Sequence, residues 1–196
     1  MLGKVWSLVL YVYGLFQGLW PCPGPQQLSV NHLASQRYQG TWYFIAAAGR
    51  RPSDIQQFTE MDNSVYHLQE ATEDGTILLT GAYSLGHESP RCFTQAWTYH
   101  LLPDKEYLDL EGHPDRRTIF WSGEWLNCPD CIMMNELDLG EVEDKLSRIM
   151  LYARNSSLSS DIVQDFQSKW TCLGVKDFLI LPRRREYCQL DGVTSI

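Results

Sequence analysis

Eight short strand-like segments follow one another between residues 41 and 154, and their close spacing restricts the fold more than any other feature. Turn residues, among them Asp74-Gly75 and Pro103-Asp104, separate these segments, and residues 112–115 are predicted to form another turn. Many short strands at such spacing are typical of an antiparallel barrel or sandwich. The predicted strands are 41–47, 64–71, 76–85, 92–102, 107–111, 117–125, 131–138 and 146–154.

A single helix is expected after the strands. Ser159 or Ser160 is a suitable N-cap, and Asp161 would lie in the first turn, where it complements the helix dipole. Gly174 follows as a stop, and residues 178–182 are expected to add an edge strand. An apolar stripe at helical spacing should pack on the outside of the strands. The stripe comprises Ile162, Val163, Phe166 and Trp170.

The ends and the charge of the chain restrict its location and its partners. With 196 residues and no linker, residues 21–196 form one predicted domain. Residues 1–20 contain an apolar run of signal-peptide length but no small-residue cleavage box, so this segment is either removed or retained as an apolar anchor. The predicted location is therefore extracellular. A net charge of −8 excludes nucleic acid as an expected partner.

Six cysteines accompany this export signal, an even number that implies disulfides in an oxidising compartment. Cys128 and Cys131 form a C-x-x-C pattern, which is found in redox dithiols, in half of a zinc site or in a local disulfide. No second C-x-x-C and no matching histidine pair follows. We therefore favour a structural role and expect neither a metal nor a cofactor. Six cysteines allow 15 connectivities.

Period-two alternation groups aromatic and polar side chains on common strand faces. In the fourth predicted strand Gln95, Trp97 and Tyr99 share a face with Phe93. In the eighth, Arg148 and Tyr152 share a face with Met150, and in the seventh Glu136 does so with Met134. If these faces point inward, the interior is an aromatic pocket with a few polar groups, as in small-molecule sites. If they point outward, aliphatic residues fill the core, and parity alone leaves both alternatives open.

Two motifs resemble those of the lipocalin family. Gly40-Thr41-Trp42 is similar to the G-x-W signature of the first lipocalin strand, and Tyr152-Ala153-Arg154 is similar to the third lipocalin motif. The resemblance implies an all-β fold: an eight-stranded antiparallel up-and-down β-barrel with one C-terminal α-helix packed outside. It also implies that Arg154 packs across Trp42 at the barrel floor, a cation–π contact.

Longer segments resemble one branch of these proteins, the apolipoprotein M family. The resemblance implies a secreted, monomeric carrier of an amphiphilic lipid, with sphingosine-1-phosphate favoured, on the lipid surface of lipoprotein particles. It also implies disulfides Cys22–Cys172 and Cys92–Cys188. The third family pair keeps Cys128 but has Ile162 at its partner position, so Cys128–Cys131 is the expected substitute. The similar segments are 42–46, 97–101, 111–115, 128–136 and 151–154.

The resemblance also assigns candidate ligand residues and modification sites. The family's headgroup residues match Trp97, Tyr99, Glu136, Arg148 and Tyr152, and Arg148 is the first choice for the main phosphate contact. Two basic family positions are replaced by Gln95 and His113, and Arg116 or Arg117 is a candidate to compensate. The family sequon at Asn135 is broken by Leu137, while Asn155 begins a new one.

The sequence favours a binding protein over an enzyme. One alternative is a lipocalin carrier for an uncharged lipid, such as a retinoid or a fatty acid, without phosphate selectivity. Another is a cysteine-dependent lipocalin enzyme that uses Cys128 or Cys131. Asp130 and Glu124 would raise the pKa of a nearby thiol, which disfavours a reactive thiolate.

Overall fold

The computed structural model describes residues 6, 22–29, 33, 35–71, 75–86, 91–102, 105–139 and 147–190. No helix among these residues is long and apolar enough to span a membrane. The predicted signal or anchor segment, residues 1–20, lies outside the described residues except for Trp6. Asp74 of one predicted turn and the whole of another, Pro103-Asp104, also lie outside them.

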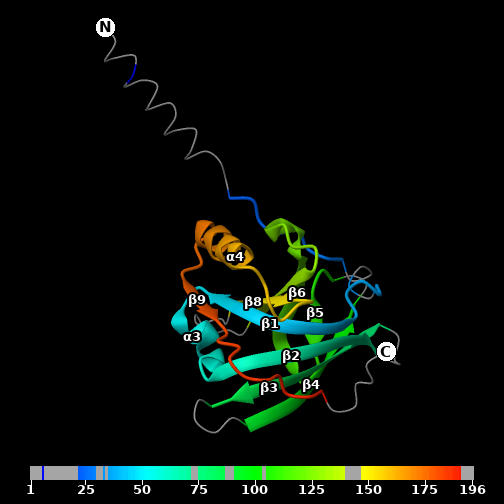
Figure 1. Ribbon diagram of the computed structural model, residues 1–196. Helices are drawn as coiled ribbons and strands as arrows, with labels where there is room; N and C mark the ends of the chain where they lie inside the picture. The colour runs from blue at the N-terminus through cyan, green and yellow to red at the C-terminus, as the bar shows by residue number, and fades with distance from the viewer. Residues whose placement is uncertain are drawn as a thin grey trace.

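The strands form the predicted closed barrel (Figure 1). Each strand pairs antiparallel with the next, from β2 to β8, and β1 closes the barrel by pairing with both β8 and β2. The barrel strands are β1 Gly40–Gly49, β2 Met61–Glu70, β3 Thr76–Leu85, β4 Arg91–Leu101, β5 Leu108–Leu110, β6 His113–Ser122, β7 Cys131–Asp138 and β8 Ser147–Ala153.

Several boundaries differ from the sequence-based expectation. The predicted turn 112–115 is wrong beyond Gly112, because β6 begins at His113. The predicted strand 117–125 ends at Ser122, whose side chain accepts a hydrogen bond from the backbone N–H of Glu124 and starts the 3₁₀ helix η2, Gly123–Leu126. Gly123 fits there because a Cβ would lie only 2.3 Å from the carbonyl oxygen of Cys128. The sequence did not predict helix α3, Pro52–Ile55, or the 3₁₀ helix η1, Gln56–Phe58.

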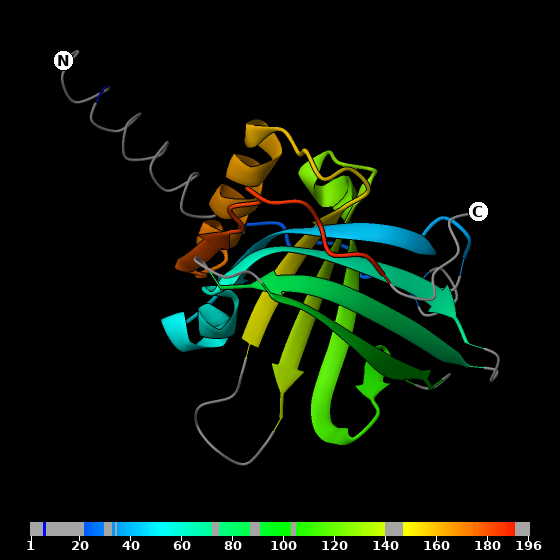
Figure 2. The ribbon, with the colours of Figure 1, turned by 60° about the horizontal axis from the view of Figure 1, so that its bottom comes forward.

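Helix α4, Ser160–Cys172, lies outside the barrel as predicted (Figure 2). Its buried residues Val163, Phe166 and Trp170 pack on the outward-facing side chains of the wall, which include Ile45 and Leu151. A separate apolar cluster fills the inside of the same wall. The period-two alternation of β1 and β8 therefore buries both faces of these strands, one against the helix and one in the interior.

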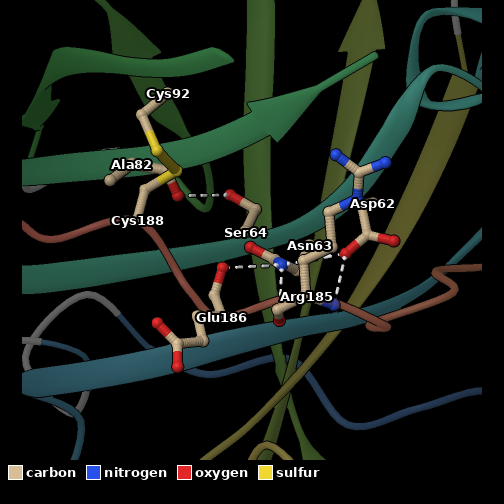
Figure 3. Close-up of a disulfide and its surroundings, with 8 residues drawn as sticks. All are labelled: Asp62, Asn63, Ser64, Ala82, Cys92, Arg185, Glu186 and Cys188. Carbon is tan, nitrogen blue, oxygen red and sulfur yellow. Dashed lines mark hydrogen bonds between the residues drawn. A yellow bond between two sulfur atoms is a disulfide. The ribbon is translucent and has the colours of Figure 1, made fainter. Parts of the chain in front are cut away.

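The C-terminal segment, residues 177–190, runs along the outside of the barrel and is called the strap (Figure 2). Strand β9, Asp177–Ile180, pairs with β1 residues 46–49, where β2 no longer accompanies β1. The backbone N–H of Arg184 then donates to the carboxylate of Asp62 at 3.4 Å. The backbone N–H of Arg185 donates to the same carboxylate at 3.1 Å, and the Asn63 amide donates to the carbonyl of Arg185 (Figure 3). These contacts hold the strap to the start of β2.

Two of the three disulfides are those that the family resemblance implied, and the third is the substitute expected where this chain departs from the family. Cys22 pairs with Cys172, so the N-terminal segment is tied to the end of α4. Cys92 pairs with Cys188 and fixes the strap to β4 (Figure 3). Cys128 pairs with Cys131, and none of the six cysteines is free.

Candidate ligand-binding site

One end of the barrel is closed by the two motifs that indicated the lipocalin fold. The guanidinium carbon of Arg154 lies 3.8 Å from the centre of the Trp42 ring. Its nitrogens donate to the backbone carbonyls of Arg37, Gln39 and Thr41, at 2.6, 2.6 and 2.9 Å. Gly40 has a φ of +95°, and a Cβ there would lie 3.3 Å from the guanidinium. A glycine is therefore needed for both the backbone conformation and the close approach.

Toward the other end the barrel holds a cavity of about 400 Å³. Eight of the nine candidate ligand residues, all but Arg117, line this cavity, so the aromatic faces point inward rather than outward. Their role in binding stays a prediction. The predicted lining residues are Gln95, Trp97, Tyr99, His113, Arg116, Glu136, Arg148 and Tyr152.

Part of the lining was not predicted. Gln57 and Phe58 enter the cavity from η1, a helical turn that carries no repeating apolar pattern. Tyr66 comes from β2, where alternation is weak in the sequence. Tyr66 and Trp97 pack 5.9 Å apart, and they do so over Gly81, where a Cβ would lie 2.6 Å from the Tyr66 ring. Met134 and Met150 also line the cavity, as expected from the faces they share with Glu136 and Arg148. The remaining unpredicted lining residues are Met61, Leu79, Tyr83 and Leu85.

A buried ion pair lies in the cavity wall. The Nε of Arg148 donates to a carboxylate oxygen of Glu136 at 2.6 Å, and a terminal guanidinium nitrogen contacts the same oxygen. Glu136 on β7 and Arg148 on β8 are directly opposite one another, and they are only 5% and 8% exposed, respectively. The guanidinium also lies 5.2 Å from the centre of the Phe58 ring. The pair is locally neutral, because Glu136 offsets the charge that was predicted to meet a phosphate.

Arg116 and Arg117, adjacent in sequence, lie on opposite faces of β6. Arg116 lines the cavity, and its buried Nε donates a hydrogen bond to no described residue. Arg117 points to the outer wall, where it donates to the Asp109 carboxylate at 2.7 Å and lies over the Tyr107 ring. Of the two arginines proposed to compensate for Gln95 and His113, only Arg116 is therefore in a position to contact a ligand.

Three tyrosines surround the ion pair. Burial raises the pKa of Tyr66 to about 12, and the Glu136 carboxylate acts in the same direction. Burial likewise raises the pKa values of Tyr99 and Tyr152 well above their usual value, with Glu136 again contributing. These hydroxyls stay protonated at physiological pH, so the cavity offers neutral hydrogen-bond donors beside its charged groups.

The remaining candidate residues lie away from the cavity. Cys128 and Cys131 are buried as well as disulfide-bonded, so neither supplies a thiolate in this structure. Asn155 is exposed in the loop between β8 and α4, and its side-chain oxygen accepts a hydrogen bond from the Ser157 N–H at 2.9 Å. The described residues contain no group of three or more His, Cys, Asp or Glu placed to hold a metal ion.

Comparisons with known proteins agree with this geometry. A family model described as the ApoM domain matches residues 1–192. The chain belongs to the apolipoprotein M family. It is 32% identical to apolipoprotein M of Rattus norvegicus over 199 residues, which cover 98% of this chain and all of that protein. The same identity and the same coverage hold for apolipoprotein M of Mus musculus.

Solved structures with low sequence identity share the barrel. The siderocalin Ex-FABP matches with a TM-score of 0.59 and 15% identity, over 82% of this chain and 100% of that chain. The odorant-binding protein OBP1 matches with a TM-score of 0.55 and 11% identity, over 82% and 97% of the two chains. Membership of the apolipoprotein M family and the lipocalin barrel support a lipid-binding carrier.

Proposed function

We propose that this chain is a secreted carrier that holds an amphiphilic lipid with an anionic headgroup, sphingosine-1-phosphate being favoured, in the barrel cavity. The observation that carries the proposal is the placement of Arg116, whose Nε is buried, without an acceptor among the described residues, in the wall of a cavity otherwise rich in aromatic and apolar side chains. A buried donor without a partner is unfavourable, and a phosphate oxygen would satisfy it.

The neighbouring groups fit the same role. Trp97 and Tyr99 supply an indole and a hydroxyl donor, and Gln95 an amide donor, while His113 lies on the same wall. Arg148 would contribute its charge when the phosphate displaces the Glu136 carboxylate from the Arg148 guanidinium or binds the guanidinium beside it. Leu79, Met134 and Met150 provide an apolar lining for the alkyl chain.

The names of the relatives support a location for the carrier on lipoprotein particles. Both curated relatives are named apolipoprotein M, which suggests association with lipoprotein particles. Residues 1–20, if retained, would hold the protein in the particle's lipid surface. The disulfides and the exposed Asn155 sequon are consistent with secretion, and we expect Asn155 to be glycosylated and the protein to be monomeric.

One observation favours a second candidate, a carrier for an uncharged lipid without phosphate selectivity. The ion pair between Glu136 and Arg148 leaves less net positive charge at the cavity than two free arginines would. The two candidates differ in how strongly the protein should distinguish sphingosine-1-phosphate from sphingosine.

Binding of these two lipids to matched arginine variants separates the candidates. We expect Arg116→Ala to weaken binding of sphingosine-1-phosphate about tenfold or more, the loss of one charge-assisted hydrogen bond, and to change sphingosine binding far less. Arg117→Ala, which removes the neighbouring outward-facing charge, should change neither. Equal binding of both lipids by the wild-type protein, unaffected by Arg116→Ala, would support the uncharged-lipid carrier instead.

A further inference from the structure

Among the described residues, the backbone hydrogen-bond ladder has a gap beside β4. Strand β5 contains only three residues and pairs with β4 only at residues 99–101. One further backbone hydrogen bond, from Glu111 to Thr98, lies next to this pairing. On that edge no described residue pairs with the first half of β4, from Arg91 to Trp97, although the whole strand is paired with β3 on its other edge.

The direction of the free backbone groups follows from the ladder. The N–H of Leu101 donates toward β3, and the carbonyl of Thr98 accepts from the β5 side. Because successive residues of a strand point their backbone groups to opposite edges, Cys92, Thr94 and Ala96 direct their N–H and C=O groups into the gap. No described residue pairs with these donors and acceptors, so they are available to water or to an external partner.

Exposure differs sharply around the rim of the cavity. The first six residues of β2 are all buried, whereas the first six of β4 are all exposed, although both strands begin at the open end. On the β2 side, Phe58 of η1 packs against Phe44 and Arg148 and covers the cavity. Among the described residues the cavity is therefore covered beside β2 and open beside β4.

Two stacked aromatic rings connect the protein surface to the cavity at this opening. Phe93 is 41% exposed and lies outside the cavity lining, but its ring stacks on Tyr83 at 5.7 Å, and Tyr83 lines the cavity. Leu85 and Gln95 line the cavity next to this pair. Exposed apolar side chains that continue into a pocket indicate a contact surface for an apolar ligand source.

We propose that a phospholipid surface docks against the free edge of β4 and that the carried lipid passes sideways between β4 and the β5–β6 hairpin into the cavity. This inference rests on the proposed lipid-carrier function. Phosphate oxygens of the headgroups are suitable acceptors for the N–H groups of Cys92, Thr94 and Ala96, while Phe93 reaches the boundary with the acyl chains. The chain's charge of −8 favours a zwitterionic surface over an anionic one.

The first test measures the rate at which the full-length protein takes up sphingosine-1-phosphate from phosphatidylcholine vesicles. We expect Phe93→Asp to slow this transfer about tenfold, because a buried aromatic contact with the lipid is lost. Binding of the same lipid supplied as a monomer should change less than about twofold, since Phe93 is outside the lining. Ile180→Asp is the matched control, because Ile180 on β9 is 43% exposed, close to the 41% of Phe93. It should leave both values unchanged.

The second test is hydrogen exchange of the β4 amides with and without phosphatidylcholine vesicles. Cys92, Thr94 and Ala96 should exchange rapidly in solution and at least about tenfold more slowly on vesicles. Wild-type transfer rates in Phe93→Asp, or no added protection on vesicles, would overturn the proposal. So would protection that appears without vesicles and grows with protein concentration, since a second copy would then cover the edge. If the wild-type protein bound no monomeric lipid, the carrier function would fail, while exchange would still report whether β4 docks.

Discussion

At the closed end of the barrel, Arg154 stacks on Trp42 and donates to three backbone carbonyls. At the open end, Arg148 lies over Phe58 but donates to a carboxylate, that of Glu136. Both arginines lie over aromatic rings. They differ in their acceptors, which belong to the backbone in one case and to a single side chain in the other.

The difference in acceptors separates a structural arginine from one that a ligand can recruit. Backbone carbonyls are fixed by the chain around them, so the contacts of Arg154 can only be kept or lost. A carboxylate can be exchanged for a phosphate, because both present anionic oxygens to the same guanidinium. We therefore expect the closed end to determine stability and the open end to determine ligand selectivity.

Removing the Cys92–Cys188 disulfide should have the largest effect and should loosen mainly the open end. The bridge closes a loop with a sequence separation of 96 residues, worth about 4–5 kcal/mol in the chain-entropy description. Urea unfolding of Cys92→Ala/Cys188→Ala should show this loss. The control Cys128→Ala/Cys131→Ala removes a bridge of separation 3 and should lose only about 1–2 kcal/mol. Equal losses would contradict the loop-length argument.

Arg148→Ala should be the next most damaging change, and it tests the open end directly. It leaves the carboxylate of Glu136 buried without its partner, and such losses are typically about 3–5 kcal/mol. We expect about 3–4 kcal/mol, because the carboxylate faces a cavity. Replacing both residues, in Arg148→Leu/Glu136→Leu, should restore most of the stability but not affinity for sphingosine-1-phosphate. A double variant as unstable as the single one would show that the pair itself stabilises the barrel.

Arg154→Ala should lower the free energy of unfolding by about 3 kcal/mol, since it removes a cation–π contact and three hydrogen bonds from one charged group. Lipid selectivity should not change. Arg154→Lys keeps the charge but not the planar fork, so it should recover only part of the loss. If Arg154→Ala altered the preference for the phosphorylated lipid, the division of roles between the two ends would be wrong.

The features of the barrel that depend on regular repetition could be predicted from the sequence. Period-two spacing grouped Gln95, Trp97 and Tyr99 on one face, and the family resemblance then indicated that the face points inward. Parity does not give distances, so the pairing of Arg148 with Glu136 and the choice of Arg116 over Arg117 emerged only from the structure. Both depend on which residues lie opposite one another across β6, β7 and β8.

The features that the sequence missed lack a repeating pattern. Helix α3 and η1 are too short to show an apolar periodicity. The strap is held by Asp62 and Asn63 through hydrogen bonds to backbone groups more than a hundred residues away. No local signal marks such an acceptor, because nothing near Asp62 in the sequence differs from an ordinary strand residue. The predicted turn 112–115 failed because Pro114 lies in an irregular part of the β5–β6 pairing, where a proline is tolerated.

Alkaline pH should lower the free energy of unfolding through Tyr66, which lies in the barrel interior between the two ends. This is the smallest of the predicted effects. Tyr66 lines the cavity and also packs in the interior cluster that contains Trp42. Burial raises its folded pKa to about 12, from 10.0 in the unfolded chain. Between these two values the folded state holds a proton that the unfolded state releases, so stability is complete below pH 10 and declines as the pH rises toward 12. The loss for this one group approaches about 2–3 kcal/mol.

Urea unfolding measured from pH 8 to 11 should show the decline, and Tyr66→Phe should reduce its slope. Tyr107→Phe, a matched substitution on the outer wall beside Arg117, is the control. A slope unchanged in Tyr66→Phe would mean that solvent reaches this tyrosine and that the cavity extends toward the closed end.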